Sequence, residues 1–211
     1  MKAKAIIFDK DGTLMNFDEF WVPVSQRAVE SILKKVNRED VSVETVLEAF
    51  GVKDGITGIN GVLCRGTYAQ MGKILYDILN ISGCKSTESE ITALTIQSYH
   101  EMINNGRVIP TCKNLRETLL TLKDRGMRLG VVTTDDRIIT LKCLNKMDIA
   151  DIIDEIYTDD GLFPTKPDPY CIETFCKKGG YVKEDVVMVG DTLTDVLFAR
   201  NSPAQAKCFE K

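Results

Sequence analysis

The chain has 211 residues, of which 44% are hydrophobic and 27% are charged, and its formal net charge is −4 at pH 7. A chain of this length buries enough surface to fold without covalent staples, and it has no apolar run near the roughly 20 residues that a membrane span needs. The negative charge argues against nucleic acid as a partner, because nucleic-acid binders usually carry a basic face. We therefore expect a soluble globular protein.

Cysteine and histidine do not form the patterns of the common metal sites. The chain has seven cysteines without a CxxC pair and a single histidine, His100. We expect reduced thiols and no disulfide scaffold, and one histidine excludes histidine-based triads and zinc clusters. After a basic start only four apolar residues precede Asp9, too few for a signal-peptide core, so a cytoplasmic location is expected.

The first apolar run of the chain ends in two carboxylates. Residues 5–8 (AIIF) predict a buried strand, and Asp9, Asp11 and Gly12 follow it. In extended backbone the period of two places Asp9 and Asp11 on the same side. An ordinary Asp and Gly turn is the simpler alternative for this stretch alone. A calcium loop of the EF-hand type is excluded, because Leu14 occupies the position where that loop needs glycine.

The segment 15–106 is predicted to be helical. Its apolar spacing indicates helices over 20–36, 43–50, 67–79 and 87–104. The last of these begins with a capping box, in which Thr87 is followed three residues later by Glu90. Five glycines between residues 51 and 66 indicate a loop, which lacks the spacing of a phosphate-binding fingerprint.

From residue 107 onward, strands alternate with helices. Strands are predicted over 128–133, 152–157 and 186–189, and helices over 111–125, 135–147, 170–178 and 195–201. This alternation implies a parallel sheet with helices on both faces, to which the opening strand must belong. The predicted fold is α/β, with a Rossmann-like parallel sheet core formed by residues 1–14 and 107–211. Residues 15–106 are predicted to be an all-helical domain inserted into it.

Oxygen-bearing side chains follow three of the predicted strands, at the edge where open parallel sheets bind ligands. They are, in chain order, Asp9 and Asp11, then Thr133, Thr134 and Asp135, then Asp191 and Asp195. A loop stiffened by prolines adds Lys166. Taken singly, Thr133 is more simply explained as a strand-end hydroxyl, Lys166 as a solvated lysine and Asp195 as a helix N-cap. Their joint occurrence at one edge favours a functional site.

Four motifs in this order resemble those of the haloacid dehalogenase superfamily, in particular its phosphoglycolate phosphatase-like subgroup with a helical cap. They are Asp-x-Asp-Gly-Thr-Leu at residues 9–14, a strand ending in Thr133, Lys166-Pro167, and Gly-Asp-x-x-x-Asp at residues 190–195. The resemblance covers essentially the whole chain. Over residues 15–106 it is one of position and helical character.

The resemblance implies a phosphatase of small phosphorylated metabolites, in which Asp9 attacks phosphorus to form an aspartyl phosphate. Asp11 would protonate the leaving group and then activate the hydrolytic water. Lys166 would offset the charge of Asp9 and of the phosphoryl group, and the Thr133 hydroxyl would donate a hydrogen bond to a phosphoryl oxygen. The backbone amides of Asp11 and Thr134 are further candidate donors.

The resemblance also implies a Mg²⁺ cofactor and a cap. Mg²⁺ would be held by the Asp9 carboxylate, the Asp11 carbonyl and Asp191, with Asp195 orienting ligands or waters. The helical segment would close over the site, and Arg65 in its glycine-rich loop is a candidate for binding a second anionic group of the substrate.

Several alternatives remain open. A sugar phosphomutase keeps the same aspartates but returns the phosphoryl group to its substrate, and a non-catalytic regulator could use the same fold. Phosphonate hydrolysis has no support, since the segment 15–106 offers no lysine assignable to Schiff-base chemistry. Neither nucleic acid nor a membrane is expected as a partner, and a monomer or homodimer is expected. The last edge strand is expected to be short or missing, and a truncated C-terminus is a further alternative, because Ser202-Pro203-Ala204 leads directly to Lys211.

Overall fold

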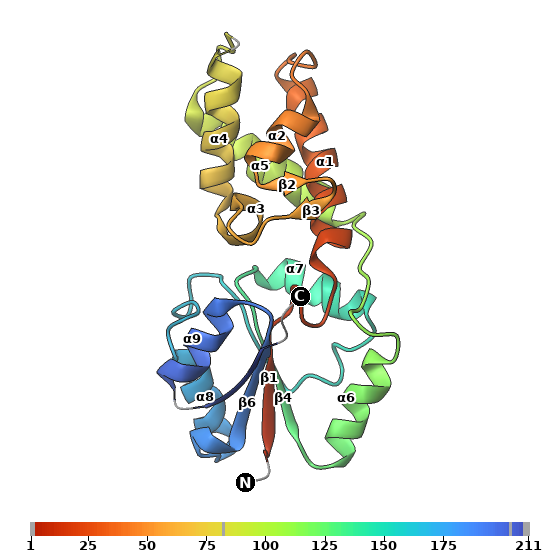
Figure 1. Ribbon diagram of the computed structural model, residues 1–211, viewed down its shortest axis with the longest axis vertical. Coiled ribbons are helices and arrows are strands. Elements are labelled where there is room, and N and C mark those ends of the chain that lie inside the picture. The colour runs from red at the N-terminus through yellow and green to blue at the C-terminus, as the bar shows by residue number, and fades with distance from the viewer. Residues whose placement is uncertain (1–2, 82, 203, 209–211) are drawn as a thin grey trace. The chain divides into compact units, whose positions relative to one another are not determined.

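The structure is a computed structural model that describes residues 3–81, 83–202 and 204–208 (Figure 1). The chain forms two compact units. Met1–Asn16 and Val108–Lys211 form the first, which we call the core unit, and Phe17–Arg107 form the second, which we call the helical unit.

The core unit is built on a five-stranded sheet of order β5-β4-β1-β6-β7. Its strands are β1 (Ala5–Phe8), β4 (Arg128–Val132), β5 (Glu155–Tyr157), β6 (Val186–Gly190) and β7 (Gln205–Cys208). Each neighbouring pair runs parallel, with β1 at the centre between β4 and β6. The parallel sheet predicted from the alternation of strands and helices is therefore confirmed. The edge strand expected to be short or missing is present as β7; the C-terminal residues beyond it, to which the truncation alternative refers, lie outside the described residues.

Helices cover both faces of this sheet. They are α6 (Leu115–Asp124), α7 (Arg137–Lys146), α8 (Tyr170–Gly179) and α9 (Leu193–Asn201), with a 3₁₀ turn, η1 (Lys183–Asp185), before β6. Figure 1 shows α6 on one side of the sheet and α8 and α9 on the other. The apolar residues between the sheet and this second pair form one buried cluster, which includes Ile7, Met188, Phe175 and Phe198. Gly130 of β4 admits the Phe175 ring, because a Cβ at this glycine would lie 2.9 Å from a ring carbon.

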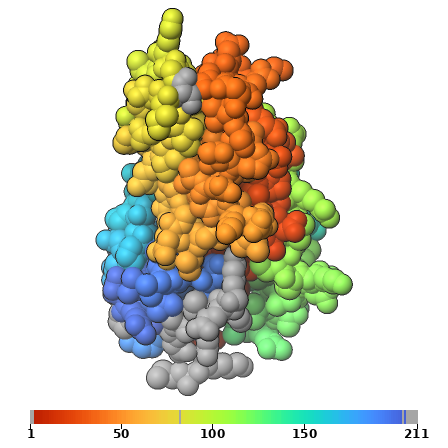
Figure 2. Space-filling model, turned by 45° about the horizontal axis from the view of Figure 1, so that its top comes forward, coloured from red at the N-terminus to blue at the C-terminus, as the bar shows by residue number. Residues whose placement is uncertain are grey.

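The helical unit contains α1 (Phe17–Lys35), α2 (Val43–Ala49), α3 (Val62–Arg65), α4 (Tyr68–Ile81) and α5 (Glu88–Ile103). In α1, Val24, Ala28 and Ile32 are fully buried, as their spacing of four predicts. The capping box predicted for α5 is confirmed, since Thr87 and Glu90 each bind the other's backbone N–H. The segments α2 and α4 lie side by side, which is visible where the orange and yellow surfaces meet in Figure 2.

The prediction that this unit contains only helices was wrong at residues 52–57. There β2 (Val52–Lys53) and β3 (Ile56–Thr57) pair antiparallel. Asp54 and Gly55 join them, both with positive φ, at 52° and 76°. An Asp-Gly pair between short extended runs favours this kind of hairpin turn, and that local signal was in the sequence. Among the described residues no helix has both the length and the apolar composition that crossing a membrane requires.

The segment that follows β1 is hydrogen-bonded to the segment that leads into α6. Asn16 N donates to Ile109 O at 2.8 Å, and Thr111 N donates to Leu14 O at 3.1 Å. The Thr111 hydroxyl also donates to Thr13 O at 2.6 Å. These bonds, all inside the core unit, hold the segment after Asp11 against the segment that precedes α6.

Candidate active site

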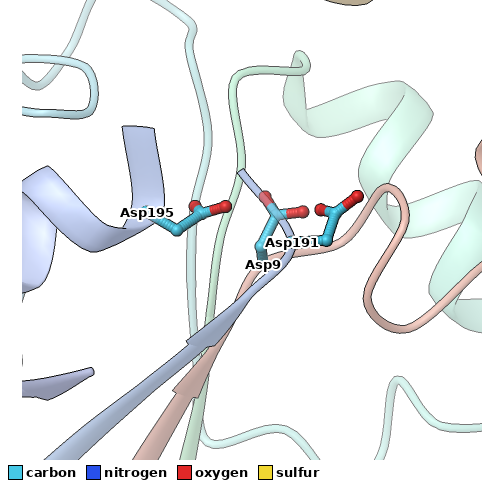
Figure 3. A group of neighbouring side chains, drawn as sticks. All are labelled: Asp9, Asp191 and Asp195. Atoms are coloured by element: carbon cyan, nitrogen blue, oxygen red, sulfur yellow. The ribbon is translucent and has the colours of Figure 1, made fainter. Parts of the chain in front are cut away.

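Three aspartates from two neighbouring strand ends gather at the carboxyl edge of the sheet (Figure 3). The parallel register pairs Phe8 with Val189, and Asp9 N donates to Val189 O at 2.8 Å, so β1 and β6 end side by side. One carboxylate oxygen from each of Asp9, Asp191 and Asp195 lies within 4.8 Å of the others. The structure thus brings together three of the side chains that the sequence singled out.

Two glycines make room for these carboxylates. Gly12 has a φ of +79°, and a Cβ built there would lie 2.1 Å from Asp191 Oδ2. A Cβ on Gly190 would lie 2.4 Å from both Cβ and Cγ of Asp195. Both distances are far below van der Waals contact, so any larger residue would displace the carboxylate. The glycines of the first and fourth motifs are therefore required by the close approach of Asp191 and Asp195.

Lys166 joins two members of this cluster. Its Nζ donates to Asp9 Oδ1 at 2.5 Å and to Asp195 Oδ1 at 2.7 Å, and its side chain is only 4% exposed. Burial alone would lower the pKa of Lys166, but the charges of Asp9 and Asp195 outweigh burial and raise it above its ordinary value. Lys166 is therefore a buried cation beside the first carboxylate of the chain.

The environment of Asp9 indicates a place for a cation. Burial raises the pKa of Asp9 to about 7; Lys166 opposes this rise, whereas the charges of Asp195 and Asp11 add to it. Burial and the neighbouring Asp195 thus disfavour the charged form of Asp9 in spite of Lys166. Their donor atoms are all carboxylate oxygens, the ligands that hard divalent cations such as Mg²⁺ prefer. The residues therefore fit a Mg²⁺ ion.

The start of α9 fixes Asp195. Thr192 is the N-cap of this helix, and Asp195 N donates to its Oγ1 at 3.4 Å. In return, Thr192 N and Oγ1 donate to Asp195 Oδ2 at 3.1 and 2.7 Å. The alternative that Asp195 is itself the N-cap is wrong. One carboxylate oxygen of Asp195 is held by the cap, and the other faces Lys166.

Asp11 forms an ion pair with a different lysine, Lys10. Lys10 Nζ lies 2.5 Å from Asp11 Oδ2 and 2.8 Å from Asp135 Oδ2, and the Lys10 side chain is 0% exposed. Burial opposes the charge of Lys10, but Asp11 and Asp135 outweigh it and raise the pKa of Lys10 above its ordinary value. Sequence reasoning missed this bridge. A lysine between two aspartates normally indicates a solvated side chain, so no local signal predicted its burial.

Of the other predicted site residues, Thr133 and Thr134 lie after β4 in the core unit, and Arg65 lies in the helical unit. Thr133, directly after β4, is buried, and its Oγ1 accepts a hydrogen bond from Asp135 N at 3.2 Å. Thr134 is exposed beside it. Arg65 is an exposed residue at the end of α3, in the helical unit. The roles in phosphate and substrate binding assigned to these three residues stay predictions, as does the Asp11 carbonyl as a metal ligand.

Comparisons with known proteins show the family. A family model described as haloacid dehalogenase-like hydrolase matches residues 3–202. A phosphoglycolate phosphatase from Haemophilus influenzae (strain 86-028NP) is 30% identical over 200 residues, which cover 93% of this chain and 80% of that protein. The pyrophosphatase PpaX of Halalkalibacterium halodurans is 26% identical over 205 residues, which cover 96% of this chain and 81% of that protein.

A solved structure has the same fold. The crystal structure of a predicted phosphoglycolate phosphatase from Haemophilus somnus superposes with a TM-score of 0.70 at 22% identity, over 98% of this chain and 84% of that chain. The family model spans both units and all four motifs. The family predicted from those motifs is thereby confirmed: the chain belongs to the haloacid dehalogenase-like hydrolases.

Proposed function

We propose that this protein is a magnesium-dependent phosphatase of small phosphorylated metabolites. The observation that carries the proposal is the cluster of Asp9, Asp191 and Asp195 with Lys166 at the carboxyl edge of the sheet (Figure 3). A phosphate monoester resists attack because its anionic oxygens repel nucleophiles. The cluster offers what this reaction needs: a carboxylate nucleophile, oxygen ligands for a divalent cation, and an ammonium group beside the nucleophile.

In the proposed reaction Asp9 is the nucleophile. A carboxylate oxygen of Asp9 bonds to phosphorus as the bond from phosphorus to the leaving oxygen breaks, and Asp11 gives its proton to the departing alkoxide. Water then bonds to phosphorus, its proton passes to Asp11, and the bond from phosphorus to Asp9 breaks. Inorganic phosphate leaves, and Asp9 is free again. Lys166 offsets charge on Asp9 and on the phosphoryl oxygens.

The proposed cofactor site uses Asp9, Asp191 and the backbone carbonyl of Asp11, with Asp195 holding its surroundings in place. A bound Mg²⁺ would supply positive charge that offsets both the carboxylates and the phosphoryl oxygens. Burial, together with the charges of Asp195 and Asp11, raises the pKa of Asp9, and a cation at this position would offset that cost.

The proposed substrates are small phosphate esters, and 2-phosphoglycolate is the first to test. The curated relative at 30% identity is a phosphoglycolate phosphatase, while a second relative is a pyrophosphatase, which makes diphosphate the next compound. We further propose that the helical unit acts as a cap and that Arg65 binds a second anionic group, such as the carboxylate of phosphoglycolate.

The deciding experiment is release of inorganic phosphate from a panel of phosphate esters, with and without Mg²⁺. The panel holds p-nitrophenyl phosphate, 2-phosphoglycolate, diphosphate and a sugar 1-phosphate. We expect Mg²⁺-dependent release, which Asp9→Asn lowers by about 10³-fold or more. Asp185→Asn is the matched control, because Asp185 is also buried and paired with a lysine, Lys4, but at the opposite end of β6.

Two outcomes would contradict the proposal. Conversion of the sugar 1-phosphate to an isomer without net phosphate release would indicate a phosphomutase. No Mg²⁺-dependent turnover on any member of the panel by folded protein would favour a non-catalytic regulator on the same fold.

A further inference from the structure

The buried side chain of Lys10 pairs with Asp11, whereas the nearby Asp9 pairs with Lys166. Asp9 contacts Lys166 at 2.5 Å, whereas Asp11 contacts Lys10 at the same distance. A buried ammonium costs free energy unless carboxylates or other acceptors surround it. Lys10 meets this requirement with Asp11 on one side and Asp135, at 2.8 Å, on the other.

We call the contacts from Asp11 through Lys10 to Asp135 the Lys10 bridge. Asp135, at the far end of this bridge, is held by hydrogen bonds of its backbone. Asp135 N donates to Thr133 Oγ1 at 3.2 Å, and Asp159 N donates to Asp135 O at 2.9 Å. The loops that follow β4 and β5 therefore hold the main chain of Asp135. Through Lys10, this anchored residue fixes one oxygen of the Asp11 carboxylate relative to Thr133.

The turn that follows β1 restricts the Lys10 side chain itself. Its Nζ lies 3.7 Å from the sulfur of Met15, and Leu14 N and Met15 N both donate to Lys10 O. The turn after β1 thus folds back over Lys10, which leaves its fully buried side chain little room to move. The direction of the Asp11 carboxylate depends on this arrangement.

We propose that Lys10 is a positioning residue, which holds the Asp11 carboxyl group where it can exchange protons with the reacting atoms. The inference rests on the proposed function. Asp11 must first give a proton to the leaving oxygen as its bond to phosphorus breaks. It must later take a proton from the water that displaces Asp9. Both transfers need Asp11 within hydrogen-bond reach, and a small displacement of such a group lowers a rate by up to about 100-fold.

The test variant is Lys10→Met, which keeps an unbranched apolar stem and removes the ammonium. p-Nitrophenolate leaves as a stable anion, so formation of the phosphoenzyme from p-nitrophenyl phosphate depends little on Asp11, whereas its hydrolysis depends on it fully. We expect kcat on this ester to fall by about 10- to 100-fold. Rapid mixing should show a stoichiometric burst of nitrophenolate before the slow steady state. An alkyl phosphate should show the loss without the burst, since its leaving oxygen needs the proton.

Matched variants keep the inference falsifiable. Lys4→Met removes a lysine–aspartate pair, with an exposed lysine and a buried aspartate, at the other end of β1 and should leave the kinetics unchanged. If Lys10→Met does not fold, Asp135→Asn decides, because it frees the far end of the bridge and keeps Lys10. It should lower kcat on p-nitrophenyl phosphate by about 3- to 10-fold, with a burst.

Several results would overturn the inference that Lys10 positions Asp11. Folded Lys10→Met with wild-type kcat, or with an equal loss on both esters and no burst, overturns the inference. So does wild-type behaviour of Asp135→Asn where Lys10→Met does not fold. Absence of turnover by the wild-type protein is a different result, because it overturns the proposed function.

Discussion

At the scale of single residues, the two aspartates of the first motif, Asp9 and Asp11, differ in their lysine partners. Asp9 shares Lys166 with Asp195, and Asp11 shares Lys10 with Asp135. The motifs in the sequence predicted that Asp9, Asp191 and Asp195 gather, because parallel strands place their carboxyl ends at one edge. The resemblance to the family already implied that Lys166 lies beside Asp9. It did not predict that Lys10 pairs with Asp11, since that pairing depends on side-chain directions within one turn.

Gly12→Ala tests the close approach between the first and fourth motifs. Gly12 has a positive φ, so alanine costs about 1–2 kcal/mol of backbone strain. The new Cβ would also meet Asp191 Oδ2 at 2.1 Å, which displaces that carboxylate. We expect both a lower free energy of unfolding and at least a roughly 10-fold loss of apparent Mg²⁺ affinity, by analogy with ligand-shell mutations. Urea unfolding and Mg²⁺ titration of activity measure the two effects.

Gly126→Ala separates the effect of backbone strain from the effect of the contact with Asp191. Gly126 has nearly the same φ, +78°, but a Cβ there would meet no atom within 4 Å. This variant should lose a similar free energy of unfolding and keep the wild-type Mg²⁺ dependence. Equal Mg²⁺ affinity in the two variants would show that the contact with Asp191 has no functional importance.

At the scale of elements, patterns in the sequence predicted the type and order of the main strands and helices, and local contacts changed their limits. The helix expected over 111–125 begins at Leu115, because the backbone of Thr111 bonds to Leu14 instead of to a helical turn. The strand expected over 152–157 begins at Glu155, since Ile152 N bonds to Ile149 O in a preceding turn. Both limits depend on contacts that periodicity does not encode.

Thr192→Ala tests whether the cap of α9 supports the site. Loss of an N-cap hydroxyl costs about 1 kcal/mol of stability. Here it also removes the hydroxyl that donates to Asp195 Oδ2 at 2.7 Å, so Asp195 is held less firmly beside Lys166. We expect a lower melting temperature and a lower kcat.

Thr87→Ala is the matched control for the cap. Thr87 forms the same type of capping box at the start of α5 in the helical unit. It should cost similar stability and leave kcat unchanged. An equal effect of the two substitutions on kcat would contradict a special role for the cap of α9.

At the scale of the whole molecule, the candidate site is assembled from segments far apart in the chain. The core unit contains all of them: residues 9–12, 133–135, Lys166 and 190–195. In the sequence, the helical unit lies between the first of these segments and the others. The alternation of strands and helices predicted this insertion. Periodicity could not predict the hairpin at residues 52–57, because its strands carry too few residues to show a period; its signal in the sequence was the Asp54-Gly55 pair.

Mg²⁺ should stabilise the folded protein through this assembly. A ligand that binds only the native state at 100 times its Kd adds about 2.7 kcal/mol of stability. We expect the melting temperature of the wild-type protein to rise with Mg²⁺, and the rise to be lost in Asp191→Asn. Asp185→Asn, a buried aspartate outside the cluster, should retain it. An undiminished rise in Asp191→Asn would remove Asp191 from the metal site.

Detection of the phosphoryl group on the protein tests the central claim most directly. Asp11→Asn should slow hydrolysis of the phosphoenzyme more than its formation from p-nitrophenyl phosphate, so acid quenching with Mg²⁺ present should trap it. Peptide mass spectrometry should then locate one phosphoryl group on the peptide that contains Asp9. Phosphate release without any phosphorylated peptide, or a phosphoryl group on another residue, would contradict the account.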